Sequence, residues 1–540
     1  MVIPVEKIRI FNTLTRREED FKPLKEKEVR IYGCGPTVYN FVHIGNFRSF
    51  VFYDFIRRVF EFNGYKVRFI MNITDVDDKT IRDSKKEKKT FSDFVNYWER
   101  IFFDQIKELN IKSPDFFPRA TAHIEEMIIM IQRLIDKDLA YLVEDGIYFS
   151  IKKFKDYGKL SKINIEGLEI GKRVNQDEYS KENPQDFALW KFWKEEDGYV
   201  FWDIRVSFEK EKVDEKILEN LMKKGIIKEK IEKEDKLELI IKGRPGWHIE
   251  CSAMSTKYLG KSFDIHLGGI DLIFPHHENE IAQSEGAFGQ KFVNYWIHIN
   301  HLLVEGKKMS KSLGNFYTLK DIKKKGFNPL ALRLFYLMSH YRKQQNFTFE
   351  SLKSAEEKLD YINETYQNYL ILKENNLFKK EKKDNELNNI YKKIIKKVNE
   401  DFNTPEALSL YFELLENINN YLRKRVDPLF FDEFYRLSND LFGFIDSKKI
   451  FFFIKKEEES KEDDYLKYFL YEIEDKIKEL GKEERIESIK NLIKLRNHYR
   501  NKKEFVKADL IREKLKDLGL KIDDWPEGTK ISFSTEILED

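Results

Sequence analysis

Residues 29–75 contain a strand, a helix and a second strand in succession, and this order constrains the fold more than any other feature. Residues 29–32 alternate apolar and polar side chains, as a strand does, and run into a glycine- and proline-containing turn at 33–36. Apolar residues then recur at helical spacing from Phe47 to Phe60, and a second strand begins at Val67. Because strands joined by a helix usually lie parallel, we expect an α/β fold with a parallel sheet.

The strand–turn–helix theme returns late in the chain. Residues 263–267 predict a strand, a pair of glycines follows, and Pro275 is expected to open a helix. Two halves of one sheet, separated by an insertion, is the simplest architecture. The predicted division is 1–138 and 246–350 for the two halves, 139–245 for the insertion, 351–464 for a helical domain and 465–540 for a small C-terminal domain. The charged segment 209–242 keeps one helical apolar stripe, which predicts a peripheral helical element.

Composition excludes several protein classes. The 540 residues include 97 Lys and Arg against 95 Asp and Glu, and the net charge of +2 argues against a protein that coats polyanions. With only two cysteines a disulfide framework is excluded, and a reducing compartment is expected. The N-terminus has no apolar core of signal-peptide length, and no apolar run approaches the roughly 20 residues of a membrane span. We therefore expect a soluble cytoplasmic protein.

Two short motifs are suited to hold a nucleoside triphosphate. Residues 43–46 read His-Ile-Gly-Asn just before the first helix, where a glycine lets the backbone approach a ligand and the helix N-terminus favours phosphate. Residues 308–312 read Lys-Met-Ser-Lys-Ser, with two lysines three apart that suit a loop closing on a triphosphate. Either motif alone would more often be a structural turn or a solvated surface, but the pair is highly specific.

Histidines and cysteines predict a metal site. Six of the ten histidines lie between His248 and His301. His276 and Glu280 are four residues apart and would share one face of a helix. Cys34 and Cys251 offer thiolates from distant parts of the chain, both in expected loop or turn contexts. His277 and Glu278 would point elsewhere on the helix, as supporting or packing groups.

These motifs resemble the paired HIGH and KMSKS signatures of class I aminoacyl-tRNA synthetases, and longer stretches resemble the cysteinyl-tRNA synthetase family. The resemblance covers almost the whole chain. Its stretches are residues 11–15, 32–39, 72–79 and 243–254, the segment around His276, then 401–408 in the helical domain and 503–529 in the anticodon-reading segment.

The resemblance implies a Rossmann-like catalytic domain and a monomeric enzyme that activates L-cysteine with ATP and Mg²⁺ and then charges tRNA(Cys). It implies one Zn²⁺ held by Cys34, Cys251, His276 and Glu280. It assigns contacts with ATP to His43, Gly45, Asn46, Gly269, Asp271, Lys308 and Lys311, of which His43, Asn46 and the two lysines are the catalytic group. It assigns the amino-acid pocket to Thr74 and Trp247.

Three departures from the family pattern stand out: Asn46 replaces a histidine, 209–242 is long, and Ile531 stands where tryptophan is common. Two other functions remain open. One is a ligase that joins cysteine to a small amine such as an amino sugar, and the other is a non-catalytic zinc-bearing RNA-binding protein. Between Lys494 and Lys516 nine Lys and Arg face three acids, an excess that suits an RNA backbone.

Overall fold

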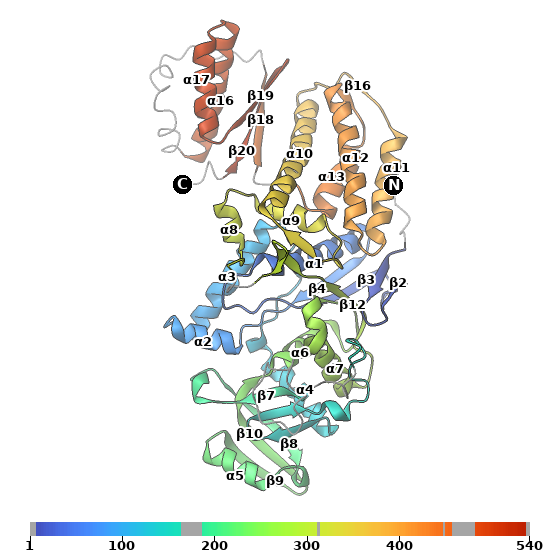
Figure 1. Cartoon of the computed structure of the whole chain (residues 1–540), viewed down its shortest axis with the longest axis vertical. Helices are drawn as coiled ribbons and strands as arrows, with labels where there is room; N and C mark the ends of the chain where they lie inside the picture. The colour runs from blue at the N-terminus through green and yellow to red at the C-terminus, as the bar shows by residue number, and fades with distance from the viewer. Residues whose placement is uncertain (1–6, 164–185, 310–313, 447–448, 456–480, 536–540) are drawn as a thin grey trace. The chain divides into compact units, whose positions relative to one another are not determined.

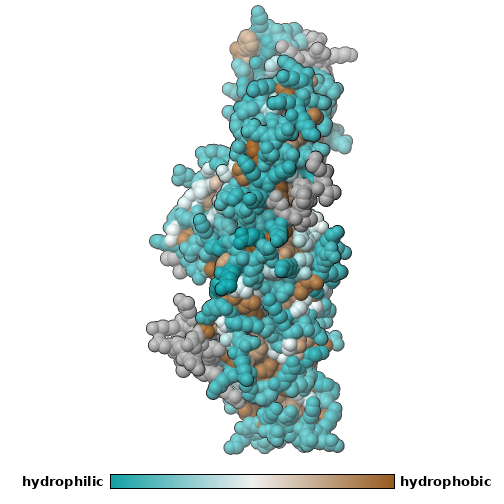
Figure 2. All heavy atoms as spheres, turned by 90° about the vertical axis from the view of Figure 1, so that its right-hand side faces the viewer, coloured by the Kyte–Doolittle hydropathy of each residue, from teal (hydrophilic) through white to brown (hydrophobic). Residues whose placement is uncertain are grey.

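The computed structural model describes residues 7–163, 186–309, 314–446, 449–455 and 481–535 (Figure 1). The chain divides into two compact units. The first comprises 1–359, 389–413 and 440–443, and the second comprises 360–388, 414–439 and 444–540. Among the described residues, no helix has both the length and the apolar character needed to cross a membrane. Hydrophilic residues dominate the face of the molecule seen in Figure 2.

A four-stranded parallel sheet organises the first unit, in the order β12-β11-β3-β4. Its strands are β3 (Glu28–Gly33), β4 (Lys66–Met71), β11 (Phe263–Gly269) and β12 (Val293–Ile299). Helix α1 (Ile44–Phe62) connects β3 to β4, and Ile31 is paired with Phe69 on one side and Ile265 on the other. The predicted sheet built from two separated halves of the chain is therefore confirmed.

Helices pack around this sheet, and α1 is buried on nearly all sides. In α1 thirteen of the nineteen residues are buried, from Ile44 to Phe60. The other helices of this region are α2 (Asp78–Lys86), α3 (Phe91–Glu108), α4 (Ile124–Asp136), α6 (Trp247–Leu259) and α7 (Glu278–Phe288). One hydrophobic cluster runs from Tyr32 and Ile70 through α4 and α6 into the insertion, where Ile147 and Leu239 belong to it.

The insertion contains a second sheet, of six antiparallel strands. Its order is β5-β6-β7-β10-β8, with β9 paired to β10. The strands are β5 (Ala140–Val143), β6 (Gly146–Phe149), β7 (Phe187–Phe192), β8 (Trp202–Glu209), β9 (Ile227–Lys233) and β10 (Lys236–Pro245).

The expectation that 209–242 is a helical element is wrong for most of the segment. Only α5 (Glu215–Lys223) is an α-helix there, after the short turn η5 (Lys210–Lys212), and two strands follow. The reason is visible in β10, where buried Leu237, Leu239 and Ile241 alternate with more exposed residues at the period of a strand. Met222, the last apolar residue of α5, is 47% exposed.

The remaining elements of the chain before α10 are short. They are β1 (Arg9–Asn12), β2 (Arg17–Asp20), β13 (Leu302–Val304), β14 (Lys307–Lys308), α8 (Leu319–Lys324), α9 (Pro329–Leu337) and β15 (Gln345–Phe347). Long helices follow, as predicted for 351–464. They are α10 (Phe349–Glu374), α11 (Asn385–Asn399), α12 (Thr404–Arg423) and α13 (Phe431–Tyr435), with the two-residue strands β16 (Lys380–Glu381) and β17 (Val426–Asp427).

The C-terminal part of the second unit is a small α/β module. It consists of β18 (Lys449–Lys455), α16 (Lys482–Asn501), α17 (Phe505–Asp517), β19 (Lys521–Trp525) and β20 (Gly528–Ser534). Strand β18 pairs with β20 over its whole length, so the module takes in a strand that lies before the boundary expected at 465. The strand was missed because its pairing partner lies about 80 residues later in the chain, too far for any local pattern to show.

Candidate active site

A cavity of about 420 Å³ opens at the carboxyl ends of the parallel strands, where α/β proteins bind their ligands. Its walls come from the loops that follow β3, β4, β11 and β12, together with the start of α1. Eleven of the thirteen predicted site residues line it: Cys34, His43, Gly45, Asn46, Thr74, Trp247, Cys251, Gly269, Asp271, His276 and Lys308. Glu280 is fully buried beside this wall, and Lys311 lies outside the described residues.

The predicted metal ligands converge at the floor of the cavity. One ligand atom from each of Cys34, Cys251, His276 and Glu280 lies within 4.8 Å of all the others, and all four residues are buried. His276 Nε2 is 3.1 Å from Glu280 Oε1, and Cys34 Sγ is 3.9 Å from the same oxygen. Zn²⁺ bonds of about 2.0–2.3 Å in a tetrahedron place ligand atoms at comparable separations. Two sulfurs, an imidazole and a carboxylate thus fit zinc in both number and type.

Three of the four predicted ligands lie in the kind of segment that was expected, but Cys251 lies in a helix and not in a loop or turn. Cys34 follows β3 in a loop, as predicted, but Cys251 lies in the first half of α6. His276 belongs to the distorted turn η7 (Ile273–His277), and Glu280 lies in the first turn of α7. The helical position of Cys251 places it one turn after Trp247, so that both side chains reach the same cavity.

The electrostatics of this cluster favour a cation. A hydrogen bond with Cys34 lowers the pKa of Cys251 to about 6 despite burial, while burial raises the pKa of Cys34 well above its usual range. Burial raises the pKa of Glu280, but His266 and His276 outweigh it and lower that pKa to about 2. Burial lowers the pKa of His276, but Cys251 and Glu280 raise it to about 10. A thiolate, a carboxylate and the His276 imidazolium therefore share one buried site, and a metal ion that replaced the imidazolium proton would still neutralise the two anions.

Two further histidines, which sequence reasoning did not select, surround the same carboxylate. His266 Nε2 lies 2.9 Å from Glu280 Oε2, and His277 Nε2 lies 3.3 Å from Cys34 Sγ. Together with Cys34 and Glu280 they form a second set of atoms within 4.8 Å. His277 thus faces the cluster, contrary to expectation, whereas Glu278 accepts backbone N–H groups of Gly158 and Ser161 and supports packing as predicted. The only available signal for His266 was a histidine inside a buried strand.

The side of the cavity that is predicted to hold the nucleotide includes the start of α1. His43 is the N-cap of this helix, and its Nδ1 accepts the N–H of Asn46 at 3.3 Å. Burial lowers the pKa of His43 to about 4, opposed by Asp271, so the ring is neutral near pH 7. With Nδ1 accepting, the proton is on Nε2, which is left as a donor. A side chain at Gly45 would press within 3.0 Å of the His43 ring and of Met309, which explains the glycine.

The two residues expected to contact the amino acid lie beside the metal ligands. Trp247 stacks on His276 with ring centroids 4.2 Å apart. The Thr74 hydroxyl donates to Glu250 at 3.0 Å and accepts from Asn72 at 3.2 Å. Lys308 is exposed on β14, in a hairpin with β13 that brings it to the cavity wall.

Comparison with known proteins decides the family. The family model for the class I (C) tRNA synthetase catalytic domain matches residues 20–210 and 212–357, and the DALR domain model matches 393–444. A cysteine–tRNA ligase of Brachyspira hyodysenteriae is 41% identical over 530 residues, covering 97% of this chain and 98% of the relative. The chain belongs to the cysteine–tRNA ligase family of class I tRNA synthetases.

Other comparisons agree with this family. The cysteine–tRNA ligase of Thermococcus gammatolerans is 40% identical over 533 residues, covering 97% of this chain and 98% of its own. In fold, the chain is similar to the methionyl-tRNA synthetase of Mycobacterium tuberculosis in complex with methionyl-adenylate, with a TM-score of 0.52. The two sequences are 15% identical, and the match covers 74% of this chain and 84% of the other. The similarity to cysteine–tRNA ligases extends through the part of the chain after residue 350, which disfavours the small-amine ligase and the non-catalytic RNA-binding protein.

Proposed function

We propose that this chain joins cysteine to tRNA, the reaction for which its relatives are named, at the cavity above the Cys34–Glu280 cluster. The observation that supports the proposal is that two predicted groups of side chains, one for the metal and one for the triphosphate, lie at the same cavity. Residues predicted to bind the metal, except Glu280, and residues predicted to bind the triphosphate, except Lys311, line one cavity of a size that suits a small substrate.

Zinc bound by Cys34, Cys251, His276 and Glu280 would supply the selection of cysteine, because it binds a soft thiolate and leaves the hydroxyl of serine protonated. An apolar pocket could not separate two amino acids that differ only in sulfur and oxygen. Trp247 closes one side of the ligand cluster by stacking on His276. Thr74, on the loop after β4, lines the same cavity, where its hydroxyl can meet the polar end of the amino acid.

The chain's own polar groups provide for the first chemical step, in which the cysteine carboxylate attacks the α-phosphate of ATP and pyrophosphate leaves. The His43 Nε2–H donates to a phosphate oxygen, and the partial positive charge at the N-terminus of α1 favours the phosphates. Gly269 and Asp271 would hold the ribose. Lys308 and Lys311 bring positive charge to the departing pyrophosphate, and Mg²⁺ would accompany the ATP.

In the second step, a hydroxyl of the terminal adenosine of tRNA attacks the adenylate carbonyl and AMP leaves. The family resemblance assigns the attack to the 2′-hydroxyl. Recognition of tRNA(Cys) would rest on the second unit, where the basic stretch from Lys494 to Lys516 covers α16 and α17. We expect the enzyme to act as a monomer in the cytoplasm.

Cysteine-dependent exchange of pyrophosphate into ATP, followed by charging of tRNA, tests the proposal. Lys311→Ala should lower the adenylation rate much more than the affinity for cysteine, because the lysine acts when charge moves onto pyrophosphate. A change confined to the cysteine dissociation constant would contradict that role. Absence of exchange would favour the RNA-binding protein, and transfer to an amino sugar without tRNA charging would favour the small-amine ligase.

A further inference from the structure

Three aromatic rings form a line that leads outward from the rim of the cavity. Phe41 lines the cavity, and its ring centroid lies 5.1 Å from that of Trp98 in α3. Trp98 in turn lies 5.1 Å from Tyr97, whose side chain is 38% exposed. Both contacts are edge-to-face, with interplanar angles of 81° and 77°. The line therefore connects the reaction cavity with the surface formed by α2 and α3, which pack on each other (Figure 1).

Lysines accompany these rings. Lys320 lies 5.7 Å from the centroid of Phe41, and Lys89 lies 4.7 Å from that of Tyr97. On the cavity wall, Lys79 lies 5.3 Å from the centroid of Tyr39. We call this set the rim platform: Tyr39, Phe41, Tyr97 and Trp98 with Lys79, Lys89 and Lys320.

The charges around the rim platform are mainly positive or already paired. Lys85, Lys86 and Lys88 are exposed at the end of α2 and in the turn after it. The acids of α2 and of the first half of α3 are bound by neighbours, whereas exposed Glu195 and Glu196 lie at the far end of α2, where Lys85 donates to the Glu196 carbonyl. Four of the bound acids form ion pairs: Glu87 with Lys89, Glu99 with Arg119, Asp83 with Arg82, and Asp78 with both Arg244 and Lys191. Asp93 accepts a hydrogen bond from the Thr90 hydroxyl. Asp77 caps α2.

We propose that the rim platform binds the unpaired 3′ end of tRNA during the transfer step. Half-exposed aromatic rings interleaved with lysines suit single-stranded nucleic acid, since bases stack on the rings and phosphates meet the ammonium groups. The terminal adenosine has to enter the cavity in which the adenylate forms, and the platform begins on the wall of that cavity. Lys89 now covers the Tyr97 ring, a place that a base can take while the ammonium turns to a phosphate.

This inference rests on the proposed function and adds to it a place for the acceptor end. A second exposed aromatic residue in the first unit, Tyr199, is 100% exposed but does not share these properties. It follows a turn with three acids, of which Glu195 and Glu196 are exposed and would repel phosphates. Tyr199 therefore offers a matched control.

The test compares the double variant Tyr97→Ala, Trp98→Ala with wild type and with Tyr199→Ala. Single-turnover transfer of cysteine from the enzyme-bound adenylate to tRNA should fall about tenfold or more in the double variant, because stacking of one or two bases is lost. Pyrophosphate exchange should stay within about twofold of wild type, because neither ring lines the cavity. Tyr199→Ala should leave both activities unchanged.

Two more measurements separate binding of the 3′ end from a loss of structure. Wild type should bind tRNA that lacks its unpaired 3′ nucleotides more weakly than intact tRNA, whereas the double variant should bind both equally. The conservative pair Tyr97→Phe, Trp98→Phe should restore transfer. Unchanged transfer in the double variant, or an equal fall of exchange and transfer, would overturn the inference. Wild type that exchanges pyrophosphate but charges no tRNA would instead overturn the proposed function.

Discussion

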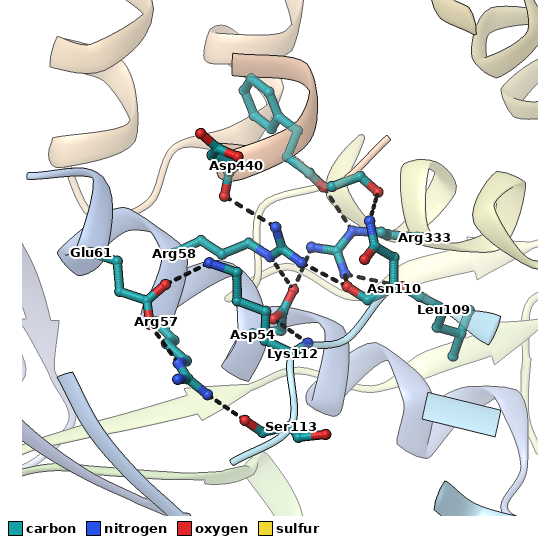
Figure 3. Close-up of polar contacts among 12 residues, drawn as sticks. Asp54, Arg57, Arg58, Glu61, Leu109, Asn110, Lys112, Ser113, Arg333 and Asp440 are labelled. Carbon is teal, nitrogen blue, oxygen red and sulfur yellow. Dashed lines mark hydrogen bonds and ion pairs between the residues drawn. The ribbon is translucent and has the colours of Figure 1, made fainter. Parts of the chain in front are cut away.

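Asp54 on α1 and Arg333 on α9 form an ion pair of 2.5 Å between Oδ2 and Nη2, and neither side chain is exposed (Figure 3). Arg58 Nε reaches the same carboxylate oxygen at 2.6 Å, and the Lys112 N–H donates to the other oxygen at 2.9 Å. The remaining donors of Arg333 go to backbone carbonyls of Leu109, Asn110 and Phe442. This one carboxylate thus joins α1, whose first residues line the cavity, to three distant segments of the first unit.

Asp54→Asn should destabilise the first unit strongly. Burial raises the pKa of Asp54, but Arg58 and Arg333 outweigh it and keep the carboxyl ionised. Removing one partner of a buried ion network leaves uncompensated charge and costs about 3–5 kcal/mol of the free energy of unfolding, measurable by urea denaturation.

The neighbouring Glu61→Gln is the matched control for Asp54→Asn. Glu61 pairs with Arg57 and Lys112, but its side chain is 28% exposed. The loss should therefore stay below about 1 kcal/mol. Equal losses in the two variants would show that burial of the Asp54 network does not determine its contribution.

Removal of a metal ligand should abolish metal binding and cysteine activation together. Cys251→Ser replaces a soft donor, and His276→Ala deletes the imidazole that lies 3.1 Å from Glu280. We expect zinc content, measured by elemental analysis, and cysteine-dependent pyrophosphate exchange to fall in parallel. Ser255→Ala, at another buried position of α6, should retain both. A protein that had lost its zinc and still preferred cysteine to serine would refute the assignment.

The sequence carried enough local information for three of the four strands of the central sheet, β3, β4 and β11, but β12 was not predicted. The apolar alternation of β3 and the helical period of α1 are properties of neighbouring residues, so they show without any tertiary structure. Among the predicted metal ligands, His276 and Glu280 stand out locally because they are four residues apart in the sequence. His266 was not found, because it meets Glu280 only through the packing of β11 against α7.

The insertion shows the opposite case. In β7 all six residues are buried, so no alternation marks the strand. In β10, apolar Ile240 interrupts the alternation of Leu237, Leu239 and Ile241, and the charged residues around it also fit a solvated helix. Only the pairing of β10 with β7, β8 and β9 gives these segments their structure. Contacts between distant segments therefore determined what the sequence left open.

Deletion of the C-terminal module should separate activation from transfer. The cut belongs before β18, because a deletion from 465 would leave β18 without its partner β20. Without residues 449–540, pyrophosphate exchange should largely persist, since the predicted nucleotide-binding residues all lie before 316. Charging of tRNA should fall steeply, because the basic stretch of α16 and α17 is gone.

A point variant controls for misfolding of the truncated chain. Arg512→Glu reverses one exposed charge on α17 in the full-length protein. It should weaken tRNA charging, more so at low salt, and leave exchange unchanged. A truncated protein that remains monodisperse and folded but loses both activities equally would contradict the prediction that the C-terminal module serves tRNA charging and not adenylate formation.

Asp524 should make the C-terminal module sensitive to acid. It forms a bidentate pair with Arg496, at 2.8 and 2.7 Å, and also contacts Arg500. Burial raises the pKa of Asp524, but these arginines outweigh it and lower the pKa to about 2, against about 3.9 in an unfolded chain. A depressed pKa stabilises the fold fully above the unfolded value, and this stabilisation is lost as the pH falls towards 2.

The size of this effect is reduced by solvent, since the Asp524 side chain is 30% exposed. Asp524→Asn should therefore lower the free energy of unfolding by about 1 kcal/mol at pH 7. The difference between wild type and variant should stay constant down to about pH 5 and narrow below about pH 4. Urea denaturation across this pH range measures the difference in the free energy of unfolding. A difference that widened on acidification would contradict the predicted depression of the Asp524 pKa.

The segment between β8 and β10, residues 211–234, which contains α5 and β9 and is called the excursion below, should be dispensable for adenylate formation. Glu209 and Lys236 are paired directly, and the Lys210 N–H donates to Asp235 O at 3.0 Å, so a tight turn such as Asn-Gly in place of 211–234 can close the hairpin. The replacement removes α5 and β9 but keeps β10, which a replacement of 209–242 would destroy. Pyrophosphate exchange should remain within about twofold of wild type, because none of residues 211–234 lines the described cavity.

A substitution inside β10 is the control. Leu239→Asp, at a fully buried position of β10, should by contrast unfold the insertion. If the shortened protein were folded but could not form the adenylate, the excursion would have a direct part in catalysis.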